Sequence, residues 1–380
     1  MNPIITPRNV RETGRVLGES CALRATQADR EARLPEEDLR ALKESGYLGM
    51  SIPLEYGGAG LSLRECAEAQ IELARGSAST AMVAAMHLQV FGHARETRPW
   101  PDDVFVQFCR AATRQGALFN SVASEPEMGS PSRGGRFRTT ARPAPGGEHF
   151  IVNGYKTWVT GGRHLTHLLV RVSVGGEASV LWMPNDLPGM TWIPAWERAL
   201  GLRASESHDL RLENVVVPAG NLIARGGQKE PPNLWFPAML TAVYLGAALA
   251  ARDAFIRYAL ERVPPALGKP IATLPSIRRQ VGEMDAELQA AATLFREVVA
   301  AWRGDESRRQ SVFTRLAAAR HIVLSTAARV TEQALRAAGG RALTDALPLE
   351  RYFRDVRPGF AQPPSSDAAL ELIGRAALEG

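Results

Sequence analysis

The stretch that decides the fold reads Asn153-Gly-Tyr-Lys-Thr-Trp-Val-Thr-Gly161. Its Asn-Gly pair is a turn signal, and the residues that follow favour extended structure. Side chains two residues apart in a strand point to the same face, so Trp158 and Thr160 can both reach one bound molecule. A lone aromatic residue on a strand is more often part of the core, and that alternative stays open at this point.

Further short β-rich runs lie on both sides of this stretch. The predicted runs cover residues 149–152, 157–160, 167–174, 179–183, 191–194 and 209–217. Gly, Pro and Asn separate them, as expected where strands are joined by turns. The pattern predicts a central β-sheet or barrel domain over residues 118–227.

Helical patterns fill the rest of the chain. Residues 1–117 contain an amphipathic stretch at 34–48, an Ala-rich one at 63–90 and a third that begins near Asp102. Beyond a Pro-containing linker at 228–233, we expect the following helices: 236–262, 277–302, 312–338 and 367–378. The sequence therefore predicts an α+β protein in which a helical domain, a sheet domain and a carboxy-terminal four-helix bundle over residues 228–380 follow one another.

Composition excludes several classes of protein. The 380 residues include 45 Lys plus Arg against 40 Asp plus Glu, and the basic residues are scattered, so nucleic-acid binding gains no support. No uninterrupted apolar run or secretory signal is present, which predicts a cytoplasmic protein without membrane insertion. The cysteines Cys21, Cys66 and Cys109 match no metal spacing, and we expect no metal site and reduced thiols.

Four separated stretches resemble the acyl-CoA dehydrogenase family, in the order that family shows. They are residues 46–60 with their glycine turn, Val122-Ala-Ser-Glu-Pro-Glu-Met-Gly-Ser130, the Asn153 to Gly161 stretch, and Arg351-Tyr-Phe-Arg-Asp355 preceded by Gly339-Gly340. Independent matches in the right order are improbable. The resemblance implies the helix, sheet, helix fold and a flavin-dependent oxidoreductase that binds FAD, with FMN as the alternative.

The resemblance also assigns flavin contacts to particular residues. In the family, a tryptophan and a threonine at the places of Trp158 and Thr160 meet the flavin ring. Hydroxyl residues at the places of Ser124 and Ser130 meet the ring and the substrate, and Ser130 is therefore also a candidate substrate contact. Small hydroxyl side chains suit this task because they donate hydrogen bonds at short range to a planar heterocycle.

A second group of candidates implies a subunit interface. Arg262 resembles a family arginine that reaches the flavin pyrophosphate of a neighbouring subunit, and a guanidinium fork suits that anion. Gly339 and Gly340 match the family's carboxy-terminal glycine turn, and Arg336 stands where many relatives have a cofactor-contacting glutamine. These residues imply a homodimer or homotetramer.

The usual catalytic base is missing. A standard acyl-CoA dehydrogenase removes the proton α to a thioester with a glutamate, so a positioned carboxylate is required. Counted from Asp355, Pro363 occupies the place of that base, and no carboxylate lies between Asp355 and Asp367. Residues 234–244, where one subgroup carries its base, contain no charge. Asp367 sits where a helix N-cap is expected, which leaves the catalytic residues unknown.

Three functions stay open from the sequence. The first is an oxidoreductase that acts on an acyl-CoA or acyl-carrier thioester with an unassigned base and passes electrons to an electron-transfer flavoprotein. The second is a two-component flavin monooxygenase on a small hydrophobic or aromatic substrate, supplied by a flavin reductase, because the ending through Gln362 resembles that branch. The third is a non-catalytic paralogue.

Overall fold

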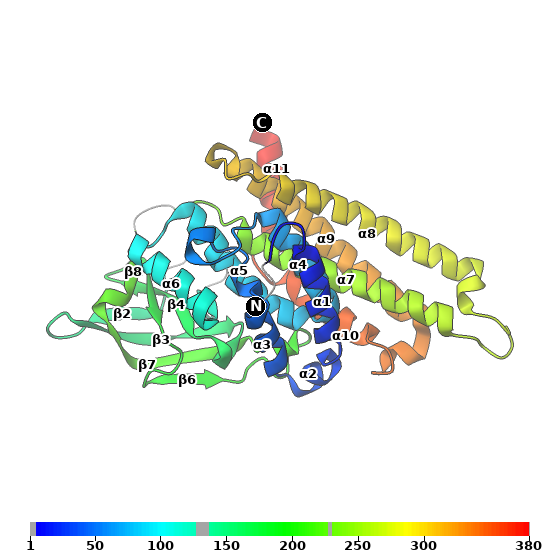
Figure 1. The fold of residues 1–380 in the computed structure, drawn as a ribbon, viewed down its shortest axis with the longest axis horizontal. Coiled ribbons are helices and arrows are strands. Elements are labelled where there is room, and N and C mark those ends of the chain that lie inside the picture. Colours follow the sequence, from blue (N-terminus) through cyan, green and yellow to red (C-terminus); the bar gives the residue numbers. More distant parts are fainter. Residues whose placement is uncertain (1–4, 127–136, 227–229, 380) are drawn as a thin grey trace.

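The computed structural model describes residues 5–126, 137–226 and 230–379. A group of helices, a twisted sheet and a set of long helices follow one another along the chain (Figure 1). The predicted helix, sheet, helix order is confirmed. Buried residues from all three parts join in one continuous hydrophobic core, so their division into separate domains stays a prediction.

The first part contains six α-helices. They are α1 (Val10–Ala22), α2 (Ala25–Glu31), α3 (Glu36–Glu44), α4 (Leu63–Gly76), α5 (Ala78–Thr97) and α6 (Asp102–Gln115). The prediction of a single Ala-rich helix over 63–90 is wrong, because α4 ends just before Ser77 and α5 begins just after it. That residue is extended, with φ −144° and ψ 106°, and its hydroxyl accepts a hydrogen bond from Thr80 N–H as the cap of α5.

The sheet holds eight strands in the order β6-β7-β3-β2-β4-β5-β8, and β1 pairs in parallel with β4. Its strands are β1 (Phe119–Val122), β2 (Thr140–Pro143), β3 (His149–Val159), β4 (His167–Val174), β5 (Glu177–Met183), β6 (Met190–Ile193), β7 (His208–Pro218) and β8 (Leu222–Ala224). The predicted runs at 149–152 and 157–160 belong to one long strand, β3, because the Asn153-Gly154 pair bends the strand without ending it.

The last part is built on three long helices, α7 (Trp235–Glu261), α8 (Pro275–Ala301) and α9 (Arg309–Ala338), followed by α10 (Leu349–Asp355) and α11 (Ser366–Glu379). The predicted apolar face of α8 is buried at Met284, Leu288 and Phe295. Helix α7 is long and apolar enough to cross a membrane by composition, but 78% of its most apolar window is buried inside the protein. It is the central helix of the bundle.

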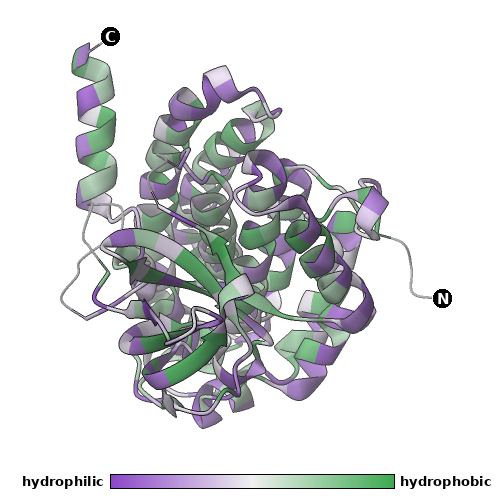
Figure 2. Ribbon diagram, turned by 90° about the vertical axis from the view of Figure 1, so that its left-hand side faces the viewer, coloured by the Kyte–Doolittle hydropathy of each residue, from purple (hydrophilic) through white to green (hydrophobic). Residues whose placement is uncertain are grey.

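Helix α11 packs against α9 and projects from the body of the molecule toward the carboxy terminus (Figure 2). Ala369 is buried, whereas Leu370 and Leu378 are exposed. The N-cap role expected for Asp367 is wrong: α11 begins at Ser366, and the hydroxyl of Ser365 accepts the hydrogen bond from Ala368 N–H. The preceding residue caps the helix because its short hydroxyl reaches the free N–H of the first turn.

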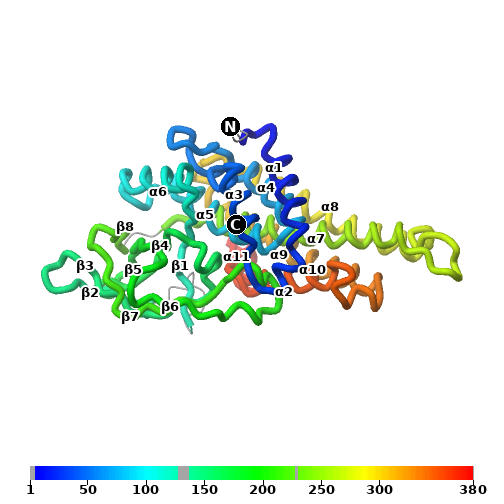
Figure 3. The backbone as a smooth tube through the Cα atoms, turned by 60° about the horizontal axis from the view of Figure 1, so that its bottom comes forward, coloured from blue at the N-terminus to red at the C-terminus, as the bar shows by residue number. Residues whose placement is uncertain are grey.

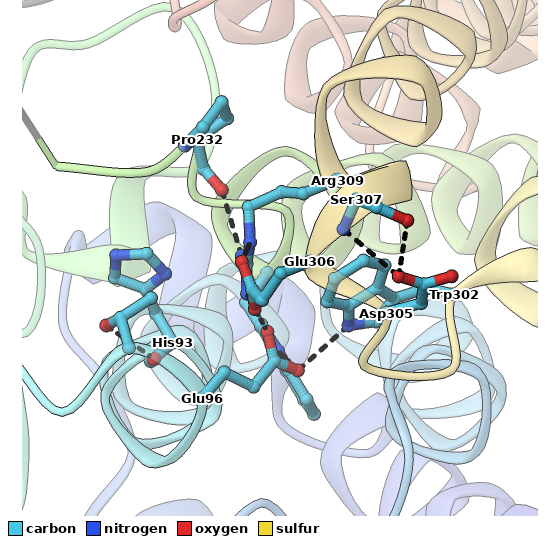
Figure 4. A network of polar contacts seen from close by, with 10 residues as sticks. His93, Glu96, Pro232, Trp302, Asp305, Glu306, Ser307 and Arg309 are labelled. Atoms are coloured by element: carbon cyan, nitrogen blue, oxygen red, sulfur yellow. Dashed lines mark hydrogen bonds and ion pairs between the residues drawn. The ribbon is translucent and has the colours of Figure 1, made fainter.

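A polar clamp fastens the bundle to the first group of helices (Figure 4). One carboxylate oxygen of Glu96, at the end of α5, accepts from the indole N–H groups of Trp235 (2.8 Å) and Trp302 (2.9 Å). The other oxygen pairs with Arg309 at 3.0 Å. Because each buried donor finds an acceptor, the clamp fixes α5 against the start of α7. Helix α5 is thereby held in place for the site described next.

Candidate active site

Trp158 presents its side chain at the end of β3. The register between β3 and β7 shifts between Lys156 and Val159, and Trp158 adopts φ +58°, which is rare for a bulky residue. Asp209 holds this bend by accepting hydrogen bonds from Trp158 N–H (3.2 Å) and from the Tyr155 hydroxyl (2.9 Å). The Trp158 side chain is 59% exposed, so the alternative that it belongs to the core is wrong.

The strict alternation expected of Trp158 and Thr160 does not hold either. Thr160 is 7% exposed and lies beyond the bulge, where it turns inward. Its hydroxyl shares a 2.8 Å hydrogen bond with Ser207, and Ser207 shares another of 2.8 Å with Ser205. Sequence reasoning missed these two serines, although their spacing of two residues just before β7 was a signal. The result is a buried row of hydroxyl groups beside an exposed indole.

Asn120 adds a further polar group that sequence reasoning missed. Its amide Nδ2 donates to the Thr160 carbonyl at 2.9 Å, which ties β1 to the end of β3. Among the described residues, its Oδ1 and the Thr157 hydroxyl are buried without a hydrogen-bond partner. Buried polar atoms are normally paired, so this amide oxygen and this hydroxyl, next to Trp158 and Thr160, fit the presence of a bound polar molecule.

Ser124 lies against the same strand. Its carbonyl accepts a hydrogen bond from Thr157 N–H at 3.0 Å. The neighbouring Glu125 forms a buried ion pair with Lys156 at 2.7 Å and also accepts from Thr139 N–H. Burial lowers the pKa of Lys156 to about 8. This pair fixes Ser124 beside Trp158, while Ser130 lies outside the described residues.

The remaining sequence candidates lie elsewhere in the molecule. Arg262 directly follows the last residue of α7, and its carbonyl accepts from Ile271 N–H. Arg336 is exposed near the end of α9, and Gly339 and Gly340 follow it. The connection from α7 to α8 and the end of α9 are on the opposite side of the molecule from the sheet in two views (Figures 1 and 3). One chain does not bring the two groups of candidates together.

The loop that follows α10 contains Pro363, the position at which the family has its catalytic base. Pro363 is partly buried there, and the adjacent Gln362 accepts a hydrogen bond from the Tyr244 hydroxyl of α7 at 2.6 Å. Arg320 of α9, which is 1% exposed, donates to carbonyl groups of this loop. Its pKa falls to about 10 through burial, so it stays charged at neutral pH. The groups around the place of the family base are therefore neutral, as in Gln362 and Tyr244, or cationic, as in Arg320.

Two buried carboxylates near the site are already engaged. Burial would raise the pKa of Glu206, but hydrogen bonds from His164 and from Leu34 N–H outweigh burial and lower it. Asp355 accepts a hydrogen bond from Leu202 N–H at 2.7 Å, and burial raises its pKa to about 6. Both carboxylates hold backbone in place, so neither is assigned as a base.

Comparison with known proteins places this geometry in a family. Models of the N-terminal, middle and C-terminal domains of acyl-CoA dehydrogenase match residues 8–95, 121–215 and 238–360. A putative acyl-CoA dehydrogenase of Bacillus subtilis, YdbM, is 36% identical over 360 residues that cover 93% of both chains. The chain belongs to the acyl-CoA dehydrogenase family. Benzylmalonyl-CoA dehydrogenase of Aromatoleum aromaticum is 29% identical and covers 92% of both chains.

Solved structures share the fold of this acyl-CoA dehydrogenase family member. FMN-bound TdsC of Paenibacillus sp. A11-2, a dibenzothiophene monooxygenase, superposes with a TM-score of 0.86 at 24% identity, over 98% of this chain and 97% of that one. Butyryl-CoA dehydrogenase of Megasphaera elsdenii gives 0.83 at 21% identity over the full length of both chains. The members of this family are flavin oxidoreductases, and the predicted class of enzyme is confirmed.

Proposed function

We propose that this protein oxidises an acyl-CoA or acyl-carrier thioester with bound FAD, by proton removal through a base that is still unassigned. One observation carries the proposal: an exposed Trp158 indole lies at the end of β3, two residues before Thr160, whose buried hydroxyl is hydrogen-bonded to that of Ser207. An aromatic face next to hydrogen-bond donors suits a planar, polar heterocycle. When bound, the flavin supplies the hydride acceptor for the reaction.

The chain's own residues position the reactants in this proposal. Trp158 packs against the flavin ring, and Thr160 and Ser124 contribute hydrogen bonds at its edge. Ser130 contacts ring and substrate. Hydroxyl groups held by one another, as Thr160 and Ser207 are, lose little freedom when a ligand binds, so they act as a pre-arranged surface.

The proposed oligomer rests on the candidates that lie on the opposite side of the molecule from the sheet. Arg262, Arg336, Gly339 and Gly340 would reach the cofactor only from a second copy of the chain, which makes a homodimer or homotetramer part of the proposal. We place the protein in the cytoplasm, where an electron-transfer flavoprotein accepts its electrons. Gel filtration with light scattering tests the oligomer, and a monomer that retains FAD would contradict it.

The decisive experiment is an anaerobic titration of the FAD-loaded protein with acyl-CoA thioesters of several chain lengths. Loss of the oxidised flavin absorption with any of them establishes the dehydrogenase reaction. Retention of that absorption with every thioester contradicts it. A protein that stays colourless and takes up no added flavin would be the non-catalytic paralogue.

A two-component flavin monooxygenase is the second candidate, with FMN in place of FAD and a flavin reductase as its partner. The observation that favours it is the loop of Gln362, where Pro363 stands at the place of the carboxylate and the Tyr244 hydroxyl and the Arg320 guanidinium bind the loop beside it. Oxygen chemistry on reduced flavin needs no base for an α-proton. Hydroxylated product from indole, formed only with reduced FMN and oxygen, would establish this candidate against the first.

A further inference from the structure

The buried Arg320 guanidinium binds the loop that contains Pro363, the position of the family base. Arg320 Nη2 donates to the carbonyls of Gly359 (3.0 Å) and Gln362 (3.1 Å), and its Nε lies 3.4 Å from the Pro364 carbonyl. The loop and the α9 helix hold each other through Nη2 and Nε, because a buried guanidinium is costly unless its N–H groups are paired. Among the described residues, Nη1 is buried without a hydrogen-bond partner. The backbone around Gln362 is therefore tethered to α9.

Tyr244 fixes the Gln362 side chain from the other side. A Cβ atom added at Gly359 would lie 3.0 Å from Tyr244 Cε2, so the loop lies directly against the phenol ring. The Tyr244 hydroxyl, which is buried, then donates to Gln362 Oε1 at 2.6 Å. Both the main chain and the carbonyl end of Gln362 are thus set by neighbours.

The amide nitrogen of Gln362 makes only a weak contact within the described part of the protein. Its contact is the thioether sulfur of Met82 at 3.9 Å, and such a sulfur is a weak acceptor. The opposite orientation of the amide would place its oxygen against that sulfur, two acceptors facing each other, which supports the orientation described. A primary amide carries two N–H groups, so the side chain keeps donor capacity for a ligand.

This donor lies close to the flavin-facing segment. Met82 is followed on α5 by Val83, whose Cγ1 is 3.7 Å from the position of a Cβ at Gly161. Gly161 comes directly after Thr160. The Gln362 amide and the Trp158 to Gly161 segment therefore meet the same turn of α5, from the bundle side and from the sheet side.

We propose that the Gln362 side-chain amide donates a hydrogen bond to the thioester carbonyl oxygen of the substrate, with Tyr244 and Arg320 as its positioning residues. The inference rests on the proposed function. A neutral amide attracts a carbonyl oxygen, whereas a carboxylate at the same place would repel it. Gln362, the neighbour of Pro363 at the place of the family base, thus gives this loop a role in binding.

The test compares two probes on the FAD-loaded protein by equilibrium dialysis. Crotonyl-CoA carries the thioester carbonyl, and its bond between the α and β carbons is already a double bond, so it is not oxidised there by the flavin. S-butyl-CoA is a thioether that lacks the carbonyl. Gln362→Glu keeps the acceptor for Tyr244 but loses both amide donors. We expect its Kd for crotonyl-CoA to rise about tenfold and its Kd for S-butyl-CoA to change less than twofold.

A second variant separates positioning from folding. Tyr244→Phe releases the Gln362 oxygen without removing the donor, so we expect a smaller loss of about threefold, again for crotonyl-CoA alone. Unchanged crotonyl-CoA binding in both variants, or an equal loss for the two probes, would overturn the role of Gln362 and leave the proposed function standing. Wild-type protein that binds neither probe would overturn the proposed function and this inference together.

Discussion

Two regions meet the same turn of α5 and differ in what they keep of the family pattern. The segment from Trp158 to Gly161 retains the aromatic and hydroxyl residues that we propose for the flavin. The loop at 359–364 has lost the carboxylate and holds Gln362 between Tyr244 and Arg320 instead. The difference teaches that the residues proposed to hold the cofactor and the place of the family base can change independently, because they lie in different parts of the chain.

The largest effect should come from the ion pair behind the flavin segment. Lys156 is fully buried and pairs with Glu125, so Lys156→Met leaves a buried carboxylate with backbone donors only. We expect a loss of about 3–5 kcal/mol in the free energy of unfolding, measured in urea. Lys269→Met, at an exposed position, is the control and should change stability by less than about 0.5 kcal/mol. Equal stability of the two variants would contradict the role of the pair.

The corresponding change on the loop side is Arg320→Met. Loss of the donors to the Gly359 and Gln362 carbonyls should cost about 2–4 kcal/mol in urea unfolding, while the affinity for FAD stays close to that of wild type. Arg315→Met, on the same helix but with its side chain 45% exposed, is the matched control. If Arg320→Met lost FAD as readily as stability, the two regions would not be separable.

Acid should weaken the packing of α5 that both regions share. His87 accepts from Phe119 N–H at Nδ1 and donates from Nε2 to the Leu48 carbonyl, and burial lowers its pKa to about 3. The unfolded chain takes up a proton below about pH 6.5 and the folded chain does not, so stability falls as pH drops. We expect His87 to contribute a loss of about 2 kcal/mol between pH 7 and 5.

Urea unfolding of wild type and His87→Gln at the two pH values measures that contribution. The variant keeps an acceptor and a donor but does not titrate, so its stability should depend less on pH. Identical pH dependence in the two proteins would show that the pKa of His87 is the same in the folded and the unfolded chain, and would contradict the lowered value.

The smallest effect should appear at the flavin surface itself. Trp158→Ala removes an exposed ring, so stability should stay within about 0.5 kcal/mol while the Kd for FAD rises about tenfold through lost aromatic contact. Ultrafiltration of the reconstituted protein measures the affinity. Trp158→Phe keeps part of the ring and should recover most of it. Unchanged FAD retention in Trp158→Ala would contradict the proposed location of the flavin at this surface.

The sequence predicted the elements well where periodicity was strong. The apolar spacing of α8 and the extended runs of β4 and β7 appear close to their predicted limits, because those patterns reflect one buried face. It failed at Ser77, where a short hydroxyl side chain ends one helix and caps the next, and at Trp158, where a bulge overrides alternation. Local hydrogen bonds set the backbone conformation at both residues, and a periodic pattern of apolar residues does not reveal such bonds.

By itself the sequence determined the family and the absence of a carboxylate at Pro363, and it supplied the proposal that Trp158 and Thr160 face the flavin, since all three are read from residue types at fixed spacing. Only the tertiary structure decided that Ser205 and Ser207 stand behind Thr160, and that Arg320 and Tyr244 hold Gln362. These contacts join residues about 40 to 120 positions apart. The physical reason is that a buried polar group must find its partner in space, wherever the chain supplies one.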